Sequence, residues 1–146
     1  MPMMRRTLVL LAAALSTRAS ALEWTAIQGL RTTRATVIAP KPTAPTVAKG
    51  DTVTVHALGI VKETEKKFWS TKDEGQSPFT YQAGVGGVIR GWDMGLLGAG
   101  VGETRKLDIP ADEGYGKRGF PAWGIPPDGG LFFEIEVLSI KGKEEL

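Results

Sequence analysis

The sequence contains no cysteine and a single histidine. Without cysteine no disulfide can form, and thiol catalysis and cysteine-ligated zinc are excluded. The histidine, His56, lies in a β-prone stretch, and the chain has no Gly-x-Ser-x-Gly elbow. A serine-type triad is therefore excluded as well, and we interpret His56 as structural, because a general base needs a partner within reach.

Long apolar runs and clusters of basic residues are also missing. The run "LVLLAAAL" (residues 8–15) has eight residues, whereas a membrane-spanning helix needs about 20. Arg5, Arg6 and Arg18 fall in the first 21 residues, which hold no acid, so removing these three charges changes the net charge from +2 to −1. The remainder lacks the basic cluster that nucleic-acid binding requires. We expect neither a membrane span nor a nucleic-acid partner.

Both ends of the chain carry targeting patterns. Two arginines precede the apolar run and "ASA" (residues 19–21) follows it, so residues 1–21 are predicted to be a secretory signal peptide. The last four residues, "KEEL", are similar to the Lys-Asp-Glu-Leu signal of the endoplasmic reticulum. We expect the lumen of the endoplasmic reticulum, with secretion or another organelle lumen as the alternative.

Alternation of apolar and polar residues predicts several short strands. They are residues 51–59, 78–84, 103–109 and 131–140, with residues 31–38 as a possible first edge strand. One short helix is predicted in "VIRGWDMGLLG" (residues 88–98), where Ile89, Trp92 and Leu96 share a face and Gly98 can end the helix. This pattern predicts an α+β fold in which an antiparallel sheet curls around the helix.

Ten of the eleven aromatic residues lie between Phe68 and Phe133. Some belong to a loop, residues 110–130, that is rich in glycine and proline, and aromatic residues in such loops usually close over a ligand. The sequence therefore predicts an apolar pocket. "GVGGVIRG" (residues 84–91) has isoleucine where a dinucleotide loop needs its third glycine. The neighbouring acids Asp112 and Glu113 are predicted to be solvated loop residues.

"VIRGWDMGLLGAGVGETRKLDIPADEGYGKRG", followed by "IPPDGGLFFEIEVL", resembles the FK506-binding-protein (FKBP) family of peptidyl-prolyl cis–trans isomerases. With the targeting patterns, the resemblance is closest to the small FKBPs of the endoplasmic reticulum. It implies action on X–Pro bonds of proline-containing polypeptides, no cofactor and no metal, and we expect a monomer. The expected division is a signal peptide (1–21), an N-terminal segment (22–46), the isomerase domain (47–141) and a tail (142–146).

The resemblance also implies roles for individual residues. Trp92 is expected to form the pocket floor, the backbone N–H of Ile89 to bind a substrate carbonyl, and the Tyr115 hydroxyl to donate a hydrogen bond. The rest of the expected site consists of the walls Phe68, Phe79, Tyr81 and Phe133, the rim residue Val88, and the lid residues Phe120 and Ile125. A dry aromatic pocket favours the twisted, less polar amide, which is differential binding of the transition state.

Two residues depart from the family pattern. The motif V-H-Y-x-G reads "VHALG" here, which puts Ala57 in the place of a pocket tyrosine. The motif F-D-S reads "FWS", which puts Trp69 in the place of an aspartate. We therefore expect weak binding of macrolides such as FK506. The alternative function is an FKBP-shaped binding or chaperone module with weak or no isomerase activity.

Overall fold

The computed structural model describes residues 22–143. The predicted signal peptide and the last three residues of "KEEL" lie outside this range. The strands are β1 (Thr25–Ala26), β2 (Thr33–Ile38), β3 (Thr52–Val61), β4 (Lys67–Ser70), β5 (Phe79–Gln82), β6 (Thr104–Ile109) and β7 (Leu131–Ile140). The helix α2 (Arg90–Gly95) and the 3₁₀ turns η1 (Ala111–Glu113) and η2 (Pro121–Trp123) complete the described elements. None of the helices in this range is long and apolar enough to cross a membrane.

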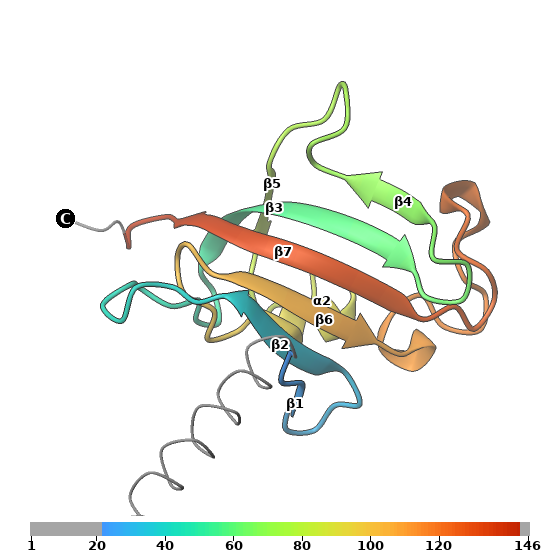
Figure 1. Ribbon diagram of the computed structural model, residues 1–146, viewed down its shortest axis with the longest axis horizontal. Coiled ribbons are helices and arrows are strands. Elements are labelled where there is room, and N and C mark those ends of the chain that lie inside the picture. Colours follow the sequence, from blue (N-terminus) through green and yellow to red (C-terminus); the bar gives the residue numbers. More distant parts are fainter. Residues whose placement is uncertain (1–21, 144–146) are drawn as a thin grey trace, which may run out of the picture.

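The strands form one antiparallel sheet in the order β1-β2-β6-β7-β3-β4, and β5 pairs with the first half of β3. The ten-residue strands β3 and β7 pair along their length and form the centre of the sheet, and α2 lies against one face (Figure 1). The predicted α+β fold, an antiparallel sheet with one short helix, is confirmed.

Strand periodicity places the buried residues as predicted. In β3, Val53, Val55 and Ala57 are buried and alternate with partly exposed residues. In β7, Leu131, Phe133, Ile135 and Val137 are buried in the same way. Side chains alternate between the two faces of a strand, so these buried residues share the face that α2 covers.

The N-terminal segment belongs to this sheet. Residues 31–38 contain β2, as predicted, but β2 is not at the edge, because β1 pairs with it through Thr25↔Arg34 and Ala26↔Thr33. On its other side, β2 pairs with β6. The strand β1 has two residues, too few to produce a periodic pattern in the sequence.

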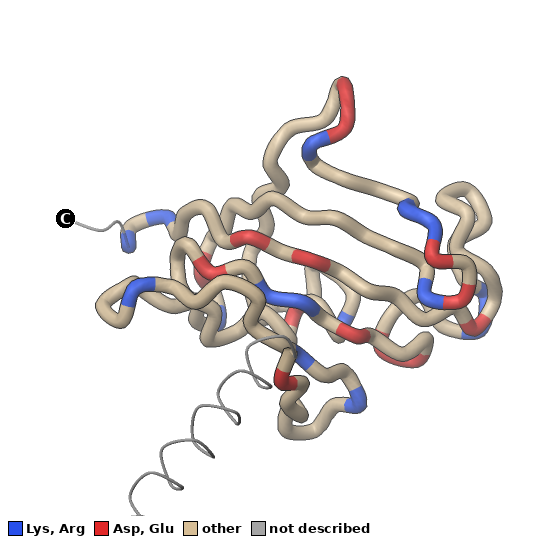
Figure 2. The backbone as a smooth tube through the Cα atoms, viewed as in Figure 1, with Lys and Arg blue, Asp and Glu red and all other residues tan. Residues whose placement is uncertain are grey.

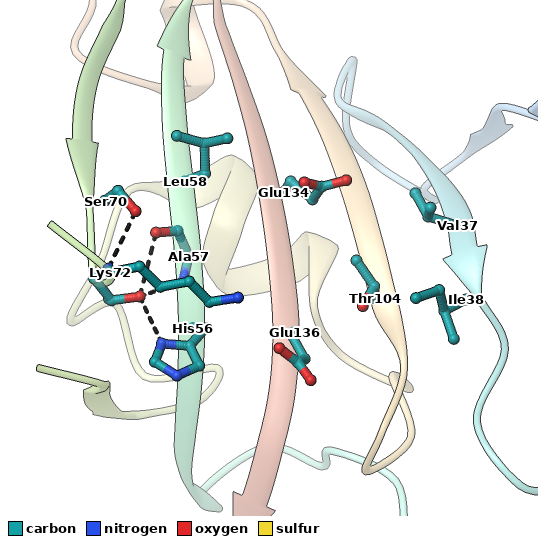
Figure 3. Close-up of a pocket in the computed structure, with 11 residues that line it drawn as sticks. Val37, Ile38, His56, Ala57, Leu58, Ser70, Lys72, Thr104, Glu134 and Glu136 are labelled. Carbon is teal, nitrogen blue, oxygen red and sulfur yellow. Dashed lines mark hydrogen bonds between the residues drawn. The ribbon is translucent and has the colours of Figure 1, made fainter.

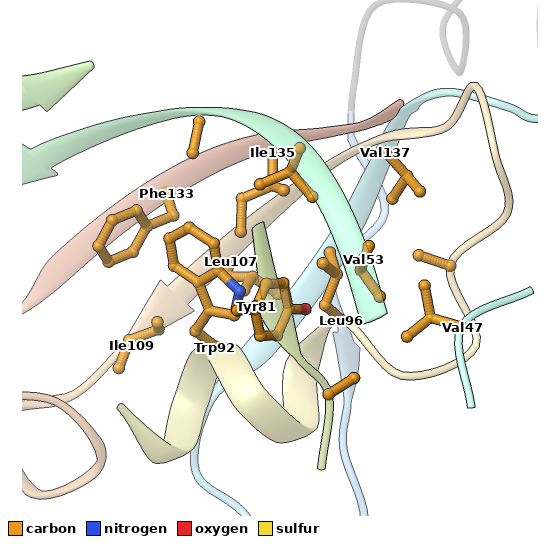
Figure 4. Packing of buried hydrophobic residues seen from close by; sticks show 14 of the residues in the cluster. Val47, Val53, Tyr81, Trp92, Leu96, Leu107, Ile109, Phe133, Ile135 and Val137 are labelled. Atoms are coloured by element: carbon orange, nitrogen blue, oxygen red, sulfur yellow. The ribbon is translucent and has the colours of Figure 1, made fainter. Parts of the chain in front are cut away.

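Glycines in α2 allow the helix to contact β6 directly. A Cβ atom at Gly91 would lie 2.6 Å from Cγ2 of Ile109, and one at Gly95 would lie 2.8 Å from Cδ2 of Leu107. Trp92, between them, is 3% exposed and points from the helix into the buried cluster beneath the sheet (Figure 4). The two glycines therefore bring the helix close enough to place the indole under the centre of the sheet.

A buried ion pair fastens the end of α2. Arg105 Nε lies 2.8 Å from Glu103 Oε2, and Arg105 Nη1 donates to the carbonyl oxygens of Gly95 and Leu97, each at 3.1 Å. Glu103 also accepts a hydrogen bond from the Gly100 N–H at 3.0 Å. Burial opposes ionisation of Glu103, but the bonds from Arg105 and Gly100 outweigh it and lower its pKa. The pair thus satisfies carbonyls that a helix end leaves without partners.

The two acids at residues 112 and 113 have different environments. Asp112 is exposed and pairs with Arg31 at 2.9 Å, as a solvated loop residue can. Glu113 is buried and accepts hydrogen bonds from the backbone N–H groups of Arg31 and Thr32, each at 2.7 Å, so the prediction that it is solvated is wrong. Burial opposes ionisation of Glu113, but these bonds outweigh it and lower its pKa. Glu113 ties the long loop to the N-terminal segment.

Candidate active site

An apolar cavity of about 440 Å³ opens between β4, β5, the start of α2 and the loop of residues 110–130. This volume falls within the ~300–1,000 Å³ of typical ligand pockets. Seven of the ten predicted site residues line it: Phe68, Phe79, Val88, Ile89, Trp92, Tyr115 and Phe133. Gln76, Ser77, Pro78 and Gly87 complete the lining together with Trp69 and Trp123.

Trp92 forms the floor of the cavity. The Phe133 ring meets its indole edge to face at a centroid distance of 5.0 Å, and the Phe79 ring does so at 5.8 Å. Such edge-to-face pairs are each worth about 0.5–1.5 kcal/mol beyond the buried area. The floor is therefore held rigidly from two sides.

Tyr81 lies behind this floor. Its side chain is buried and does not line the cavity, so its predicted place in the wall is wrong. The ring stacks on Phe79 at 5.9 Å and meets Trp92 edge to face at 5.8 Å. Burial raises the pKa of the Tyr81 hydroxyl. Strand alternation predicted its inward direction correctly, but could not distinguish a residue at the cavity surface from one in the layer beneath.

A β-bulge turns two adjacent residues toward the cavity. Gly59 pairs with Trp69 and Ile60 pairs with Lys67, so Phe68 is an extra residue in β4. Regular alternation would send either Phe68 or Trp69 to the other face, whereas a bulge changes the direction of the side chains that follow it. Both side chains line the cavity as a result.

Small residues of β3 face the bulge. Gly59 lies opposite Trp69, and a Cβ atom there would come within 2.5 Å of Phe68 Cζ, so this glycine makes room for the Phe68 ring. Ala57 occupies the diagonal position on the same face, within the range of aromatic side chains. Trp69 contacts Phe79 edge to face at 5.8 Å and Trp92 at 6.1 Å. Trp69 is therefore a wall of the cavity, whereas Ala57 is buried and does not line it.

A buried aspartate holds the rim. Asp93 accepts hydrogen bonds from the N–H groups of Gly84 at 2.7 Å and Gly86 at 2.8 Å. Both glycines have positive φ, 75° and 80°, and the turn they form leads into Val88 and Ile89. Within residues 22–143, the backbone N–H of Ile89 donates to no other group, so it is free to bind a ligand at the start of α2.

The long loop adds two aromatic side chains to the cavity. Tyr115 is half-buried, and burial raises the pKa of its hydroxyl. Trp123 stacks on Phe68 at 6.3 Å and lines the cavity although it is 47% exposed. The turn η2 ends at Trp123 and directs the indole to the cavity mouth.

The predicted lid residues lie elsewhere. Phe120 is 37% exposed and packs on Trp123 at 4.8 Å and on Tyr115 at 5.5 Å, outside the cavity lining. Ile125 is 1% exposed and belongs to the core. An antiparallel bridge between Phe120 and Ile125 closes the loop around η2. That bridge turns Ile125 inward and leaves Trp123 at the cavity mouth.

Comparisons with known proteins agree with this geometry. The family described as FKBP-type peptidyl-prolyl cis-trans isomerase matches residues 44–138. "Peptidyl-prolyl cis-trans isomerase FKBP12" of Arabidopsis thaliana is 54% identical over 104 residues, which cover 70% of this chain and 88% of that protein. The chain belongs to the FKBP family. "Peptidyl-prolyl cis-trans isomerase FPR2" of Saccharomyces cerevisiae is 46% identical over 92 residues, covering 63% of this chain and 67% of that protein.

A solved FKBP structure has the same fold. The N-terminal domain of FKBP42 from Arabidopsis thaliana superposes with a TM-score of 0.71 at 22% identity, covering 82% of this chain and 92% of that one. The resemblance to FKBPs and the enzyme class, peptidyl-prolyl cis–trans isomerase, are thus confirmed. The narrower likeness to the FKBPs of the endoplasmic reticulum stays a prediction.

The chemistry available in this FKBP cavity is non-covalent. The lining contains aromatic and aliphatic side chains, a serine, a glutamine and the Tyr115 hydroxyl, and no charged side chain. No group of three or more histidine, aspartate or glutamate residues within the described range is placed to hold a metal ion. The arrangement is suited to enclosing an apolar ring and to donating hydrogen bonds at the rim.

Proposed function

We propose that this FKBP isomerises X–Pro bonds of polypeptides in the secretory pathway, in the lumen of the endoplasmic reticulum. The observation that carries the catalytic part is the aromatic cavity over Trp92, with the Ile89 N–H, which donates to no group of residues 22–143, at its rim. The proline ring is expected to lie on the indole, while the Ile89 N–H binds a substrate carbonyl and positions the chain.

Rotation about the X–Pro bond is slow because the planar amide is stabilised by resonance, with a barrier of ~18–20 kcal/mol. Twisting the bond ends conjugation of the proline nitrogen lone pair with the carbonyl and reduces charge separation. An apolar cavity therefore binds the twisted form better than the planar form, which lowers the barrier. A phenol is protonated at neutral pH, and burial raises the pKa of Tyr115 further, so its hydroxyl can donate a hydrogen bond to the substrate. No bond is broken.

Exchange spectroscopy tests the catalytic part of the proposal. A Leu-Pro peptide is mixed with ¹⁵N-labelled protein, and cis–trans exchange is measured together with the amide shifts of the protein. We expect faster exchange and a saturable shift of the Ile89 amide, with a smaller shift of the Glu65 amide, in the exposed turn between β3 and β4, as the control. An unshifted Ile89 amide at saturation would contradict its proposed role.

The location is proposed from the two ends of the chain, the signal pattern at residues 1–21 and the terminal "KEEL". A fluorescent protein inserted in the exposed turn at Pro42–Thr43 leaves both ends free. Deletion of residues 143–146 is expected to release the protein into the medium. Equal retention of both forms would contradict retrieval through the tail. Import into another organelle would favour the alternative location, with the Arg5-Arg6 pair acting as a twin-arginine signal.

A second candidate function rests on Trp69. Its indole forms part of the cavity wall, where the resemblance implies a smaller, polar residue. A narrowed cavity would bind proline-containing segments without isomerising them efficiently, and the protein would then act as a chaperone module. The remaining volume of about 440 Å³ favours the isomerase. Weak FK506 binding is expected in either case, because the tryptophan removes the carboxylate acceptor.

A further inference from the structure

Glu113 differs from the charged residues on the outer face of the sheet. The hollow on that face is lined by charged side chains of both signs, Glu134, Glu136 and Lys72 (Figure 3), and acidic and basic residues are spread along the trace in Figure 2. Glu113, in contrast, is 8% exposed. Its hydrogen bonds come from backbone N–H groups and a hydroxyl, not from a basic side chain. Because a buried carboxylate is costly without such donors, its position is closely defined.

Three donors of the N-terminal segment hold the Glu113 carboxylate. The N–H groups of Arg31 and Thr32 donate to one oxygen each at 2.7 Å, and the Thr32 hydroxyl donates at 2.6 Å. Hydrogen bonds to an ionised carboxylate are roughly twice as strong as those between neutral groups. All three donors precede residues 44–138, the range that matches the FKBP family. Glu113 is therefore anchored by a segment outside the family match.

Thr32 also contacts the helix that carries the cavity floor. Its side chain is 0% exposed, and a Cβ atom at Gly91 would lie 2.6 Å from the Thr32 Oγ1. The hydroxyl thus lies directly against the backbone of α2. Gly91 is the residue before Trp92 and lies two residues after Ile89. Thr32 therefore joins the floor of the cavity to Glu113.

A tight turn connects the position of Glu113 to that of Tyr115. The 3₁₀ turn η1 ends at Glu113. The N–H groups of Gly114 and Gly116 both donate to the carbonyl oxygen of Ala111, at 3.0 and 2.7 Å. These two bonds lie on either side of Tyr115, whose side chain lines the cavity. A displacement of Glu113 would therefore displace the Tyr115 phenol as well.

We propose that Glu113 and Thr32 are positioning residues of the isomerase site, and that the N-terminal segment is in this way part of that site. Neither residue lines the cavity. Together they fix the Tyr115 hydroxyl relative to the Ile89 N–H and the Trp92 indole. A small misplacement of a group that contacts the substrate can cost much of its effect on the rate. The inference rests on the proposed isomerase function.

Tyrosine signals test the positioning without an activity assay. The chain has two tyrosines, so ¹³C-tyrosine labelling of the full chain reports on Tyr115, with Tyr81 behind the cavity floor as an internal reference. Glu113→Gln and Thr32→Val should shift the ring signals of Tyr115 and leave those of Tyr81 in place. Asp112→Asn is the matched control, because it removes one charge and an exposed ion pair from the same turn. This control, and Thr32→Ser, which keeps the hydroxyl, should shift the Tyr115 signals less.

Kinetics test whether the positioning acts through Tyr115. Glu113→Gln and Thr32→Val should each reduce kcat/KM for a Leu-Pro peptide by about threefold to tenfold, the worth of one hydrogen bond, mainly through kcat. In a Tyr115→Phe background the same changes should have less than about a twofold effect, because the hydroxyl that they position is absent. Asp112→Asn and Thr32→Ser should keep the wild-type kcat/KM. Circular dichroism verifies that each variant is folded under the assay conditions.

Two results would overturn the proposal. One is an unchanged set of Tyr115 ring signals in Glu113→Gln and Thr32→Val. The other is a loss of kcat/KM that is as large in the Tyr115→Phe background as in the wild type, which would indicate general destabilisation. If one of the two variants does not fold, the other tests the same hydrogen bond from its other partner. A wild-type chain without isomerase activity would contradict the proposed function, whereas the tyrosine signals would still decide whether Glu113 and Thr32 position Tyr115.

Discussion

Replacing Trp69 with alanine should widen the cavity at a cost in stability that the structure allows us to estimate. The change removes one edge-to-face pair with Phe79 and one tilted pair with Trp92. At about 0.5–1.5 kcal/mol for each pair, the free energy of unfolding should fall by about 1–3 kcal/mol. The value stays below the ~3–5 kcal/mol of a fully buried tryptophan, because Trp69 is only partly buried.

The neighbouring substitution at residue 57 makes this prediction sharper. Ala57→Tyr alone places a large side chain beside Trp69 and should cost about 1–3 kcal/mol through overpacking. In the double change Ala57→Tyr with Trp69→Asp this overlap is absent, so the two sites should couple by ~0.5–3 kcal/mol. FK506 should bind the double variant more tightly than the wild type or either single variant.

Urea unfolding gives the stability of the four proteins, and a calorimetric FK506 titration gives their affinities. A double-mutant cycle built from the unfolding free energies, and a second one built from the binding free energies, isolate the coupling between residues 57 and 69. Additive effects of the two substitutions on stability and on affinity would refute the idea that Ala57 and Trp69 compensate for each other. An unchanged FK506 affinity and turnover in Trp69→Ala would show that the indole does not form the cavity wall.

Four further outcomes are expected. Gly91→Ala should lower the free energy of unfolding by about 1–3 kcal/mol, measured in urea, since its Cβ would meet both Ile109 and Thr32 at 2.6 Å; an unchanged midpoint would contradict the tight helix–sheet contact. Tyr115→Phe should keep the circular dichroism spectrum and reduce kcat/KM in an isomerase assay. The free energy of unfolding should decrease as the pH falls below about 4.5, because the pKa of Glu113 is lower in the folded state than in the unfolded state. The stabilisation is present above the unfolded pKa and is lost when Glu113 is protonated. Glu113→Gln should be less stable at pH 7, and its stability should depend less on pH. Residues 22–146 should elute as a monomer and unfold cooperatively after chelation of metals, and loss of the transition after chelation would contradict this.

The regular strands and the helix were predictable because the sequence shows the periodic spacing of their buried residues. The alternation in β3 and β7 identified the buried face, and the spacing of Ile89, Trp92 and Leu96 identified the helix. The helix is shorter than predicted, since α2 ends at Gly95 and Leu96 is its C-cap, two residues before Gly98 with its φ of 83°. Most of the cavity lining followed from the family motifs once the resemblance was clear.

Features that depend on tertiary contacts were not predictable in this way. The bulge at Phe68 has no periodic signature, and the direction of Trp123 depends on a bridge between Phe120 and Ile125. Buried charges such as Arg105 look like surface residues in a sequence, because only their hydrogen-bond partners make burial possible.

A protease-coupled assay of residues 22–146 with a Leu-Pro peptide tests the central claim most directly. The protease cleaves only the trans isomer, so the slow phase reports isomerisation of the X–Pro bond. We predict a slow-phase rate that rises in proportion to protein concentration and that falls toward the uncatalysed rate in Tyr115→Phe. A wild-type rate equal to that of the uncatalysed reaction at every protein concentration would contradict the account and favour the binding-module alternative.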